Sequence, residues 1–411
     1  MSFGSVLSFG FESVVCSCCW LLPDLLGIYL HAALAYSPNT ISTVFYKQAE
    51  VTTAIDGTLM VVHIFRMPVF YAMAGFFTAL LLQRNNFWRA VKNRFWRIVV
   101  PLVVGWICLF PLVVLLVGTA QYGFDQTVRA ILSGQVLKYA HPLHLWFLEY
   151  LIVLYLLAAI VVVVLPALFP EHVRALLLRL FRSAVQSLLA PLLFAVPSFL
   201  AMLQMKTPWL ETPPSFEPVL RIVIAYSIPF AFGWLLFLNP DLLWTLKRRA
   251  WLYTVFAVIA SLAYLASLVV PMNLHVSFYV GRAGHSLALW LFIFGITGLF
   301  LRYLGGHSAL WRYLCDSSYF LFIAHPPVII AVQALLKDAP LPPLVKLALV
   351  FISTLVVLMP LYHYCVRATF IGVALNGRKY PIAHTPAVAC RFASEYVASC
   401  LMRLQRRTQV S

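Results

Sequence analysis

Long apolar runs dominate the chain and are separated by short polar segments. A helix needs about 20 mostly apolar residues to cross a bilayer, and ten runs reach roughly that length. They cover residues 14–36, 59–83, 97–118, 144–169, 186–204, 219–239, 249–271, 281–303, 317–337 and 341–365. The fifth run is the weakest, because Pro191 and Pro197 interrupt it. Strands of a membrane barrel would be about ten residues long with alternating polarity. The pattern therefore predicts an all-α, polytopic integral membrane protein with about ten transmembrane helices.

Charge alternates between the polar segments. If the N-terminus is cytoplasmic, the segments predicted to lie inside carry most of the 29 Lys and Arg residues, and the outer ones are mildly acidic. This distribution follows the positive-inside rule and places both termini in the cytoplasm. Only 10% of the residues are charged, against about 25% in soluble domains. Topology thus explains the net charge of +16, and no nucleic-acid partner is expected.

Two regions stand apart from the main pattern. We expect a membrane domain over residues 1–370, in which residues 1–24 are atypical, and a basic cytoplasmic tail over 371–411. Residues 387–407 could form an amphipathic helix that binds anionic membrane lipids, or could be a loosely ordered basic segment. The first run lacks a basic leader and reads as an uncleaved span. The eight cysteines have no partners at metal-ligand spacing, so no metal site is predicted.

Ionisable residues inside apolar runs cost free energy to place in the bilayer, and they are functional candidates by default. His31 lies about two thirds of the way across the first run, where a neutral imidazole could act as a general base. His63 and Arg66 share one helix face at about the same depth, and Arg66 could hold a substrate carboxylate or a developing oxyanion. We predict these three as catalytic. The alternatives are a histidine that only bonds a neighbouring helix and an arginine paired with Glu149.

Further candidates lie in other segments. Arg94 and Arg97, in the sequence RFWR, form a fork suited to phosphate groups, although ordinary positive-inside charge would look the same. His144 begins the fourth run, where it could line a substrate site or belong to the interfacial belt. His325 precedes two prolines, whose freed carbonyls it could cap. We predict substrate-binding roles for His144, His325 and Glu149.

Six segments occur in an order that is similar to a known family. They read LLGIYLHAALAYS, HIFRMPVFYAMAGFF, KNRFWRIVVPL, HLWFL, SSYFLFIAHPP and YHYCVRATFIGVALNGRK. This set resembles the membrane acyltransferase-3 superfamily, and most of all its glucan-modifying, succinyl-transferring branch. The resemblance implies a multi-pass protein of the bacterial inner membrane without a bound cofactor. It would use cytoplasmic acyl-CoA (succinyl-CoA or acetyl-CoA) as co-substrate and acylate a hydroxyl of a periplasmic glucan. It also implies that His31 is the catalytic base and that Arg94 and Arg97 contact acyl-CoA.

One position departs from that resemblance. The family carries an arginine eleven positions before the histidine, and Trp20 stands there. Either the first 24 residues come from a mis-assigned start or a shifted reading frame, or the arginine and its activity have been lost. Other functions remain open. The chain could acetylate another glycan or a lipid-linked sugar, or it could be a proton-linked transporter using His31, His63 and Arg66. Paired internal repeats, which many transporters have, are not evident.

Overall fold

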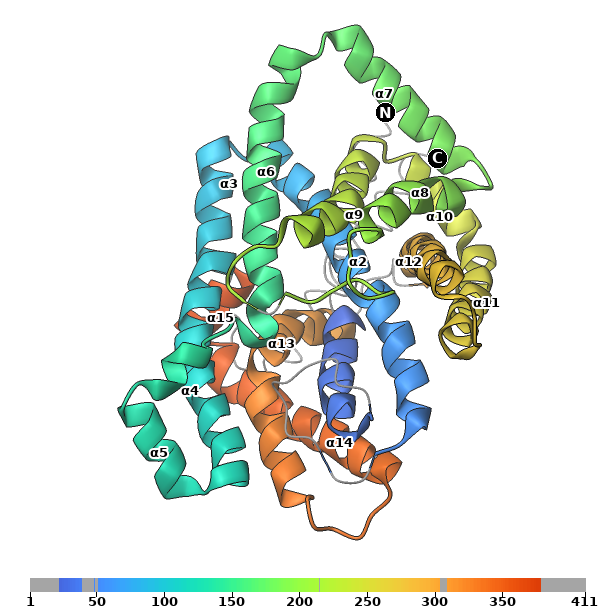
Figure 1. Cartoon of the computed structure of the whole chain (residues 1–411). Helices are drawn as coiled ribbons and strands as arrows, with labels where there is room; N and C mark the ends of the chain where they lie inside the picture. Colours follow the sequence, from blue (N-terminus) through green and yellow to red (C-terminus); the bar gives the residue numbers. More distant parts are fainter. Residues whose placement is uncertain (1–21, 39–47, 49–50, 214, 304–308, 378–411) are drawn as a thin grey trace, which may run out of the picture.

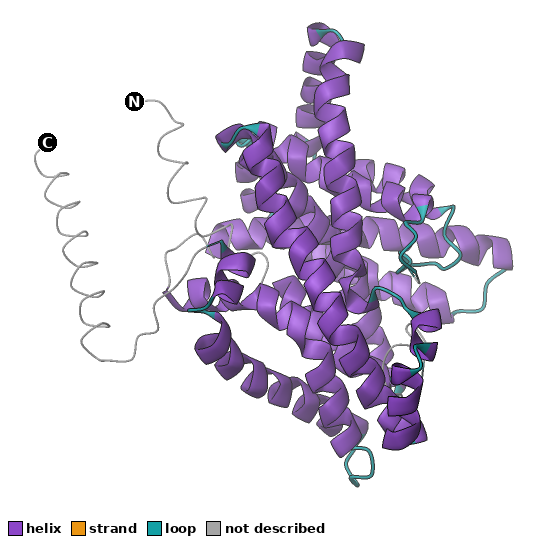
Figure 2. Cartoon of the chain, turned by 90° about the vertical axis from the view of Figure 1, so that its left-hand side faces the viewer, coloured by secondary structure: helices purple, strands orange, loops and turns teal. Residues whose placement is uncertain are grey.

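The protein is built from helices throughout the part of the chain that the structure describes. The structure, a computed structural model, describes residues 22–38, 48, 51–213, 215–303 and 309–377. Within these ranges there are helices, turns and loops but no strand, which confirms the predicted all-α class (Figures 1 and 2). Eight of the helical segments found there are long and apolar enough to cross a membrane, and one bent helix pair meets the same test jointly. The chain is therefore a multi-pass membrane protein.

The first predicted span is described only in part. Residues 22–33 are helical, and the 3-10 turn η1 (Leu34–Tyr36) follows them. Trp20 and the basic tail beyond residue 377 lie outside the described residues.

The remaining elements follow in chain order. They are α2 (Thr53–Arg84), α3 (Phe87–Arg94), the π-helical turn η2 (Phe95–Val99), α4 (Val100–Tyr122), α5 (Phe124–Leu132), the 3-10 turns η3 (Gln135–Tyr139) and η4 (Leu143–Leu145), α6 (Trp146–Leu168), α7 (Glu171–Gln186), α8 (Ala190–Met202), α9 (Leu220–Leu238), α10 (Leu242–Arg248), α11 (Ala250–Val269), α12 (Leu274–Tyr303), α13 (Ala309–Leu335), α14 (Pro343–Leu361), the π-helical turn η5 (Tyr362–Val366) and α15 (Phe370–Asn376).

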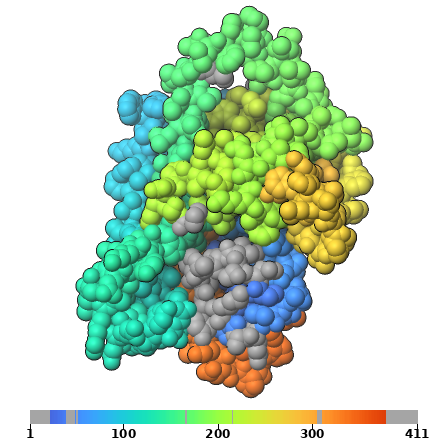
Figure 3. Space-filling view, viewed as in Figure 1, coloured from blue at the N-terminus to red at the C-terminus, as the bar shows by residue number. Residues whose placement is uncertain are grey.

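The fifth predicted run, 186–204, is not one continuous helix. The chain breaks after Gln186, and α7 and α8 meet at 117°. At about 1.5 Å per residue, α8 is about 20 Å long and cannot cross a core of about 30 Å alone. The preceding α7 exposes leucines as well as arginines, as amphipathic interfacial helices do. Together with the end of α6 it stands above the rest of the bundle (Figure 3).

Helix α2 occupies the centre of the bundle (Figure 1). Both α2 and α12 are mostly buried, whereas α4 and α11 turn most of their surface outward. Two glycines allow α2 and α9 to touch backbone to backbone. A Cβ on Gly75 would lie 1.9 Å from the carbonyl oxygen of Phe230, and one on Gly233 would lie 1.6 Å from that of Ala72. Such small-residue contacts pack membrane helices tightly, so the helix that carries His63 and Arg66 is held firmly in place.

Candidate functional site

Three histidines from distant segments meet in the interior. His31 comes from the helix over 22–33, His144 from η4 and His325 from α13. The ring centroids of His31 and His325 are 5.1 Å apart, those of His144 and His325 4.9 Å, and those of His31 and His144 6.1 Å. All three side chains are buried. We call them the histidine cluster. The sequence marks each of the three as a candidate site residue, but it does not indicate that their side chains meet.

Backbone carbonyls set the protonation pattern of two of these rings. His144 Nε2 lies 3.1 Å from the carbonyl oxygen of Ile323, and His325 Nδ1 lies 3.2 Å from that of Leu321. A carbonyl only accepts, so these nitrogens carry the protons and the opposite nitrogen of each neutral ring is an acceptor. Pro327 has no N–H to bond the residue four positions back, so the carbonyl of Ile323 is available to His144.

The backbone beside His144 is strained. Leu143 has a φ of 55°, a left-handed conformation that costs a branched residue roughly 1–2 kcal/mol. Such strain persists where the surrounding structure imposes it, and it collects at functional sites. Here it lies at the turn η4, directly before the residue that enters the histidine cluster.

Arg66 reaches the same region from α2. Its side chain is only 5% exposed, and it forms no hydrogen bond or ion pair with any residue that the structure describes. It lies against the helix over 22–33, since a Cβ on Gly27 would be 2.8 Å from Arg66 Nη1. Gly27 is one turn before His31, which agrees with the predicted shared depth. The side chains of Tyr226, Asp24 and Tyr71 lie near enough to Arg66 to interact with it. Among the described residues, no ion pair joins it to Glu149, the partner considered from the sequence.

Asp24 is a site residue that the sequence reasoning missed. It is 6% exposed and lies close to Arg66 and Ser318. The signal in the sequence is a carboxyl group inside an apolar run, where ionisable residues are functional candidates by default. Glu149 lies at the start of α6, and its buried Oε2 has no hydrogen-bond partner among the residues described.

His63 forms its hydrogen bond with a different part of the chain. Its Nε2 lies 2.8 Å from the carbonyl oxygen of Leu210 and donates to it. Leu210 belongs to the segment between α8 and α9. No ring contact between His63 and the histidine cluster is found in the part of the chain that the structure describes.

A cavity of about 480 Å³ lies beside Arg94 and Arg97, for which the sequence predicts a phosphate site. We call it the basic cavity. Its polar and charged lining consists of Asp24, Arg84, Asn85, Asn93, Arg94, Arg97, Tyr155, Asp316, Ser318, Tyr319 and Asn376. Arg94 donates to Thr78 Oγ1 at 3.4 Å and stacks over Tyr155. Arg97 donates to the carbonyl oxygen of Leu375 at 3.1 and 3.3 Å. The structure therefore brings both arginines to one cavity, which reaches inward to the buried Asp24.

One aromatic layer separates this cavity from the histidine cluster. Phe147 lines the cavity, and its ring centroid is 4.4 Å from that of Phe322. Phe322 in turn lies 5.2 Å from the ring of His144 and 5.8 Å from that of His325. The contacting rings of Phe147 and Phe322 therefore connect the lining of the cavity to the histidine cluster.

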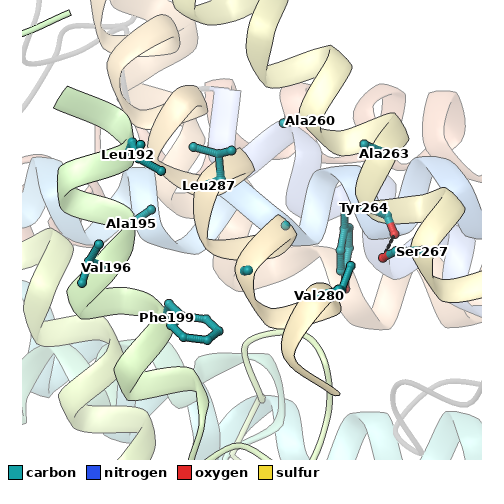
Figure 4. A pocket seen from close by; sticks show the side chains of 12 residues that line it. Leu192, Ala195, Val196, Phe199, Ala260, Ala263, Tyr264, Ser267, Val280 and Leu287 are labelled. Carbon is teal, nitrogen blue, oxygen red and sulfur yellow. Dashed lines mark hydrogen bonds between the residues drawn. The ribbon is translucent and has the colours of Figure 1, made fainter. Parts of the chain in front are cut away.

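A second hollow has a different character. It lies between α8, α11 and α12, measures about 450 Å³ and is lined by small and apolar side chains, with Tyr264 and Ser267 as its polar members (Figure 4). None of its lining residues is charged, so it offers nothing to a phosphate or carboxylate. The basic cavity is therefore the better candidate for an anionic substrate.

Comparison with known proteins identifies the family of the chain. Residues 25–363 match the model of a protein family described as an acyltransferase domain, Acyl_transf_3. No curated protein and no solved structure matches the chain. Because the family match covers most of the sequence, the chain belongs to the acyltransferase-3 family.

Proposed function

We propose that this member of the acyltransferase-3 family transfers an acyl group, preferably succinyl, from cytoplasmic acyl-CoA to a hydroxyl of a periplasmic glucan, as an enzyme of the bacterial inner membrane. One observation carries the proposal. A basic cavity and a cluster of buried histidines lie on the two sides of a single aromatic layer within a membrane bundle. Such a pair of sites suits a donor and an acceptor that arrive from opposite sides of the membrane.

The basic cavity suits the acyl-CoA donor. Arg84, Arg94 and Arg97 border it, and guanidinium groups bind phosphate oxygens through paired, charge-assisted hydrogen bonds. The positive-inside pattern supports a cytoplasmic position for this end, where acyl-CoA is found. The thioester would extend from the arginines past Asp24 and Phe147 toward His31.

The chemistry is a transfer without net gain or loss of protons. His31 would remove the proton from a glucan hydroxyl as the oxygen attacks the thioester carbonyl carbon. The carbon–oxygen bond forms, the carbon–sulfur bond breaks, and the proton passes to the departing sulfur. The products are an ester of the glucan and free coenzyme A with its thiol restored.

Arg66 supplies a buried positive charge beside Gly27, which lies one helical turn before His31. Without an ion-pair partner among the described side chains, its guanidinium can bind either the carbonyl oxygen as it becomes negative or the distal carboxylate of a succinyl group. A carboxylate at this position would neutralise the buried charge, which favours a dicarboxylic acyl group over acetyl. Arg66 therefore supports the proposal of a succinyl rather than an acetyl donor.

The decisive experiment replaces His31 by alanine. Membranes containing the variant would be supplied with labelled succinyl-CoA and a glucan acceptor, and esterified glucan would be measured by mass spectrometry. Loss of a general base lowers the rate by about 10²–10⁴-fold. His172→Ala changes an exposed histidine on α7 and should retain full transfer. A His31→Ala protein that acylates glucan at the normal rate would disprove the proposed role.

A further inference from the structure

Three buried hydrogen-bond acceptors follow one side of the first helix. Two are the ring nitrogens His144 Nδ1 and His325 Nε2, and the third is Gln333 Oε1. Gln333 is fully buried, and its amide nitrogen donates to the carbonyl oxygen of Ala32 at 3.1 Å. That bond identifies the remaining amide atom as the oxygen. Each of the three atoms has no hydrogen-bond partner among the residues described.

The chemistry of these atoms selects the kind of ligand. Nitrogen lone pairs of neutral imidazole and an amide oxygen can only accept hydrogen bonds. A carboxylate or a phosphodiester has no proton to donate to them, whereas every hydroxyl of a sugar has one. Buried acceptors in native proteins are normally paired. A polyhydroxylated ligand would pair all three, and an anion would pair none.

The spacing of the acceptors indicates the length of that ligand. His325 and Gln333 lie eight positions apart on α13, which corresponds to about 12 Å along a helix. Both face the first helix, since His325 stacks on His31 and Gln333 bonds Ala32. These two positions are about two turns of α13 apart, so a ligand longer than one hexose ring fits them best. The fully buried hydroxyl of Tyr36, also without a hydrogen-bond partner among the described residues, lies one turn beyond Ala32.

We propose that His144, His325 and Gln333 form a binding site for a sugar chain of at least two residues. The sugar whose hydroxyl reacts would lie at His325 and His144, beside His31, and a neighbouring sugar of the same chain would donate to Gln333 Oε1. This inference rests on the proposed acyl transfer and adds to it. Gln333 selects an oligosaccharide over a monosaccharide acceptor, without contact to the acyl donor.

The test compares Gln333→Leu with wild-type protein on two acceptors, a glucan oligosaccharide and a methyl glucoside. We expect the KM for the oligosaccharide to rise about tenfold, as for loss of one hydrogen bond. The kcat, the KM for succinyl-CoA and the KM for the methyl glucoside should not change. Gln204→Leu, which alters an exposed glutamine, is the matched control and should behave as wild type. If Gln333→Leu leaves both KM values unchanged or raises them equally, the inference is wrong.

Two further measurements keep the test decisive. If Gln333→Leu does not fold, Gln333→Asn retains the amide on a shorter side chain, and it should lose the preference for the longer acceptor. Wild-type protein that forms no ester with either acceptor would instead refute the proposed function itself. Stabilisation of the purified protein against heat by the oligosaccharide, weaker in Gln333→Leu, should accompany the change in KM, and equal stabilisation of both proteins would contradict the inference.

Discussion

Two buried arginines, Arg66 and Arg282, have opposite surroundings. Arg282, on α12, is 3% exposed, and each of its nitrogens donates to a backbone carbonyl: Nε to Met202, Nη1 to Phe278 and Nη2 to Met205. Arg66, on α2, is 5% exposed and has no hydrogen bond to any described residue.

The difference separates a structural charge from a functional one. Arg282 donates to the carbonyls of Met202, at the end of α8, and Met205, just after it, and so fixes the start of the segment that connects α8 to α9. All three of its nitrogens thus already donate to backbone carbonyls. The guanidinium of Arg66 still has its hydrogen-bonding capacity available, beside His31. Burial alone, which is nearly equal, would not distinguish the two.

The largest expected effect comes from exchanging each arginine for methionine. Arg66→Met should reduce acyl transfer by about 10²–10³-fold, as for loss of a charge that stabilises a transition state, with little change in thermal stability. Arg282→Met removes three charge-assisted bonds and should destabilise the protein by about 3 kcal/mol, while the folded fraction keeps its activity. Transfer assays and thermal unfolding of detergent-purified protein measure both. The comparison fails if Arg66→Met unfolds the protein or Arg282→Met inactivates folded protein.

The sequence predicted much of this arrangement, but not all of it. The apolar runs predicted the spans because membrane helices bury their own backbone bonds, and Arg66 stood out because charge inside a run is costly. Arg282 lies at the edge of its run, where snorkelling is common, so the sequence does not indicate that it is buried. The meeting of His31, His144 and His325 depends on how three distant helices pack. No local pattern encodes that packing, and the same is true of the contact between Gly27 and Arg66.

The basic cavity provides the second prediction. Replacing Arg94 and Arg97 together by glutamine should raise the KM for acyl-CoA about 100-fold, since two phosphate contacts of about 1.5 kcal/mol each contribute about 3 kcal/mol together. The kcat should change less, because these arginines lie across the aromatic layer from His31. Arg89→Gln alters an exposed arginine of the same segment that does not line the cavity. If Arg89→Gln raises the KM as much, general positive charge rather than a specific site explains the effect.

Gly27 allows a subtler change at Arg66. A Cβ there would meet Arg66 Nη1 at 2.8 Å, so Gly27→Ala should displace the guanidinium without removing it. Small misplacements of a catalytic group can cost up to about 10²-fold, and we expect about a tenfold loss of kcat with unchanged stability. In Gly57→Ala, the nearest atom to the new Cβ is Leu265 Cδ1 at 3.8 Å, so this control should be silent. Full activity of Gly27→Ala would mean that the position of Arg66 is not critical.

Variants of His63 test whether this residue acts with Arg66 or belongs to the structural contacts made by Arg282. In sequence it is three residues from Arg66, and the shared helix face suggested a shared catalytic role. In the structure its ring bonds Leu210, in the segment between α8 and α9. Arg282 bonds Met205 in the same segment, and Tyr264 bonds Pro208 there. These contacts group His63 with the structural region. We therefore expect His63→Ala to lower stability by about 1 kcal/mol, the contribution of one hydrogen bond, and to change kcat by less than threefold.

A catalytic His63 would behave differently. Its loss would lower kcat by about 10²-fold or more at unchanged stability, and His63→Gln, which can still donate to Leu210, would not restore activity. If His63 is structural, His63→Gln should recover most of the lost stability, because an amide N–H replaces the ring N–H as donor. Measuring kcat and the unfolding temperature for both variants therefore assigns His63 to one region or the other. It also decides whether the face shared with Arg66 reflects common chemistry or only the helical repeat.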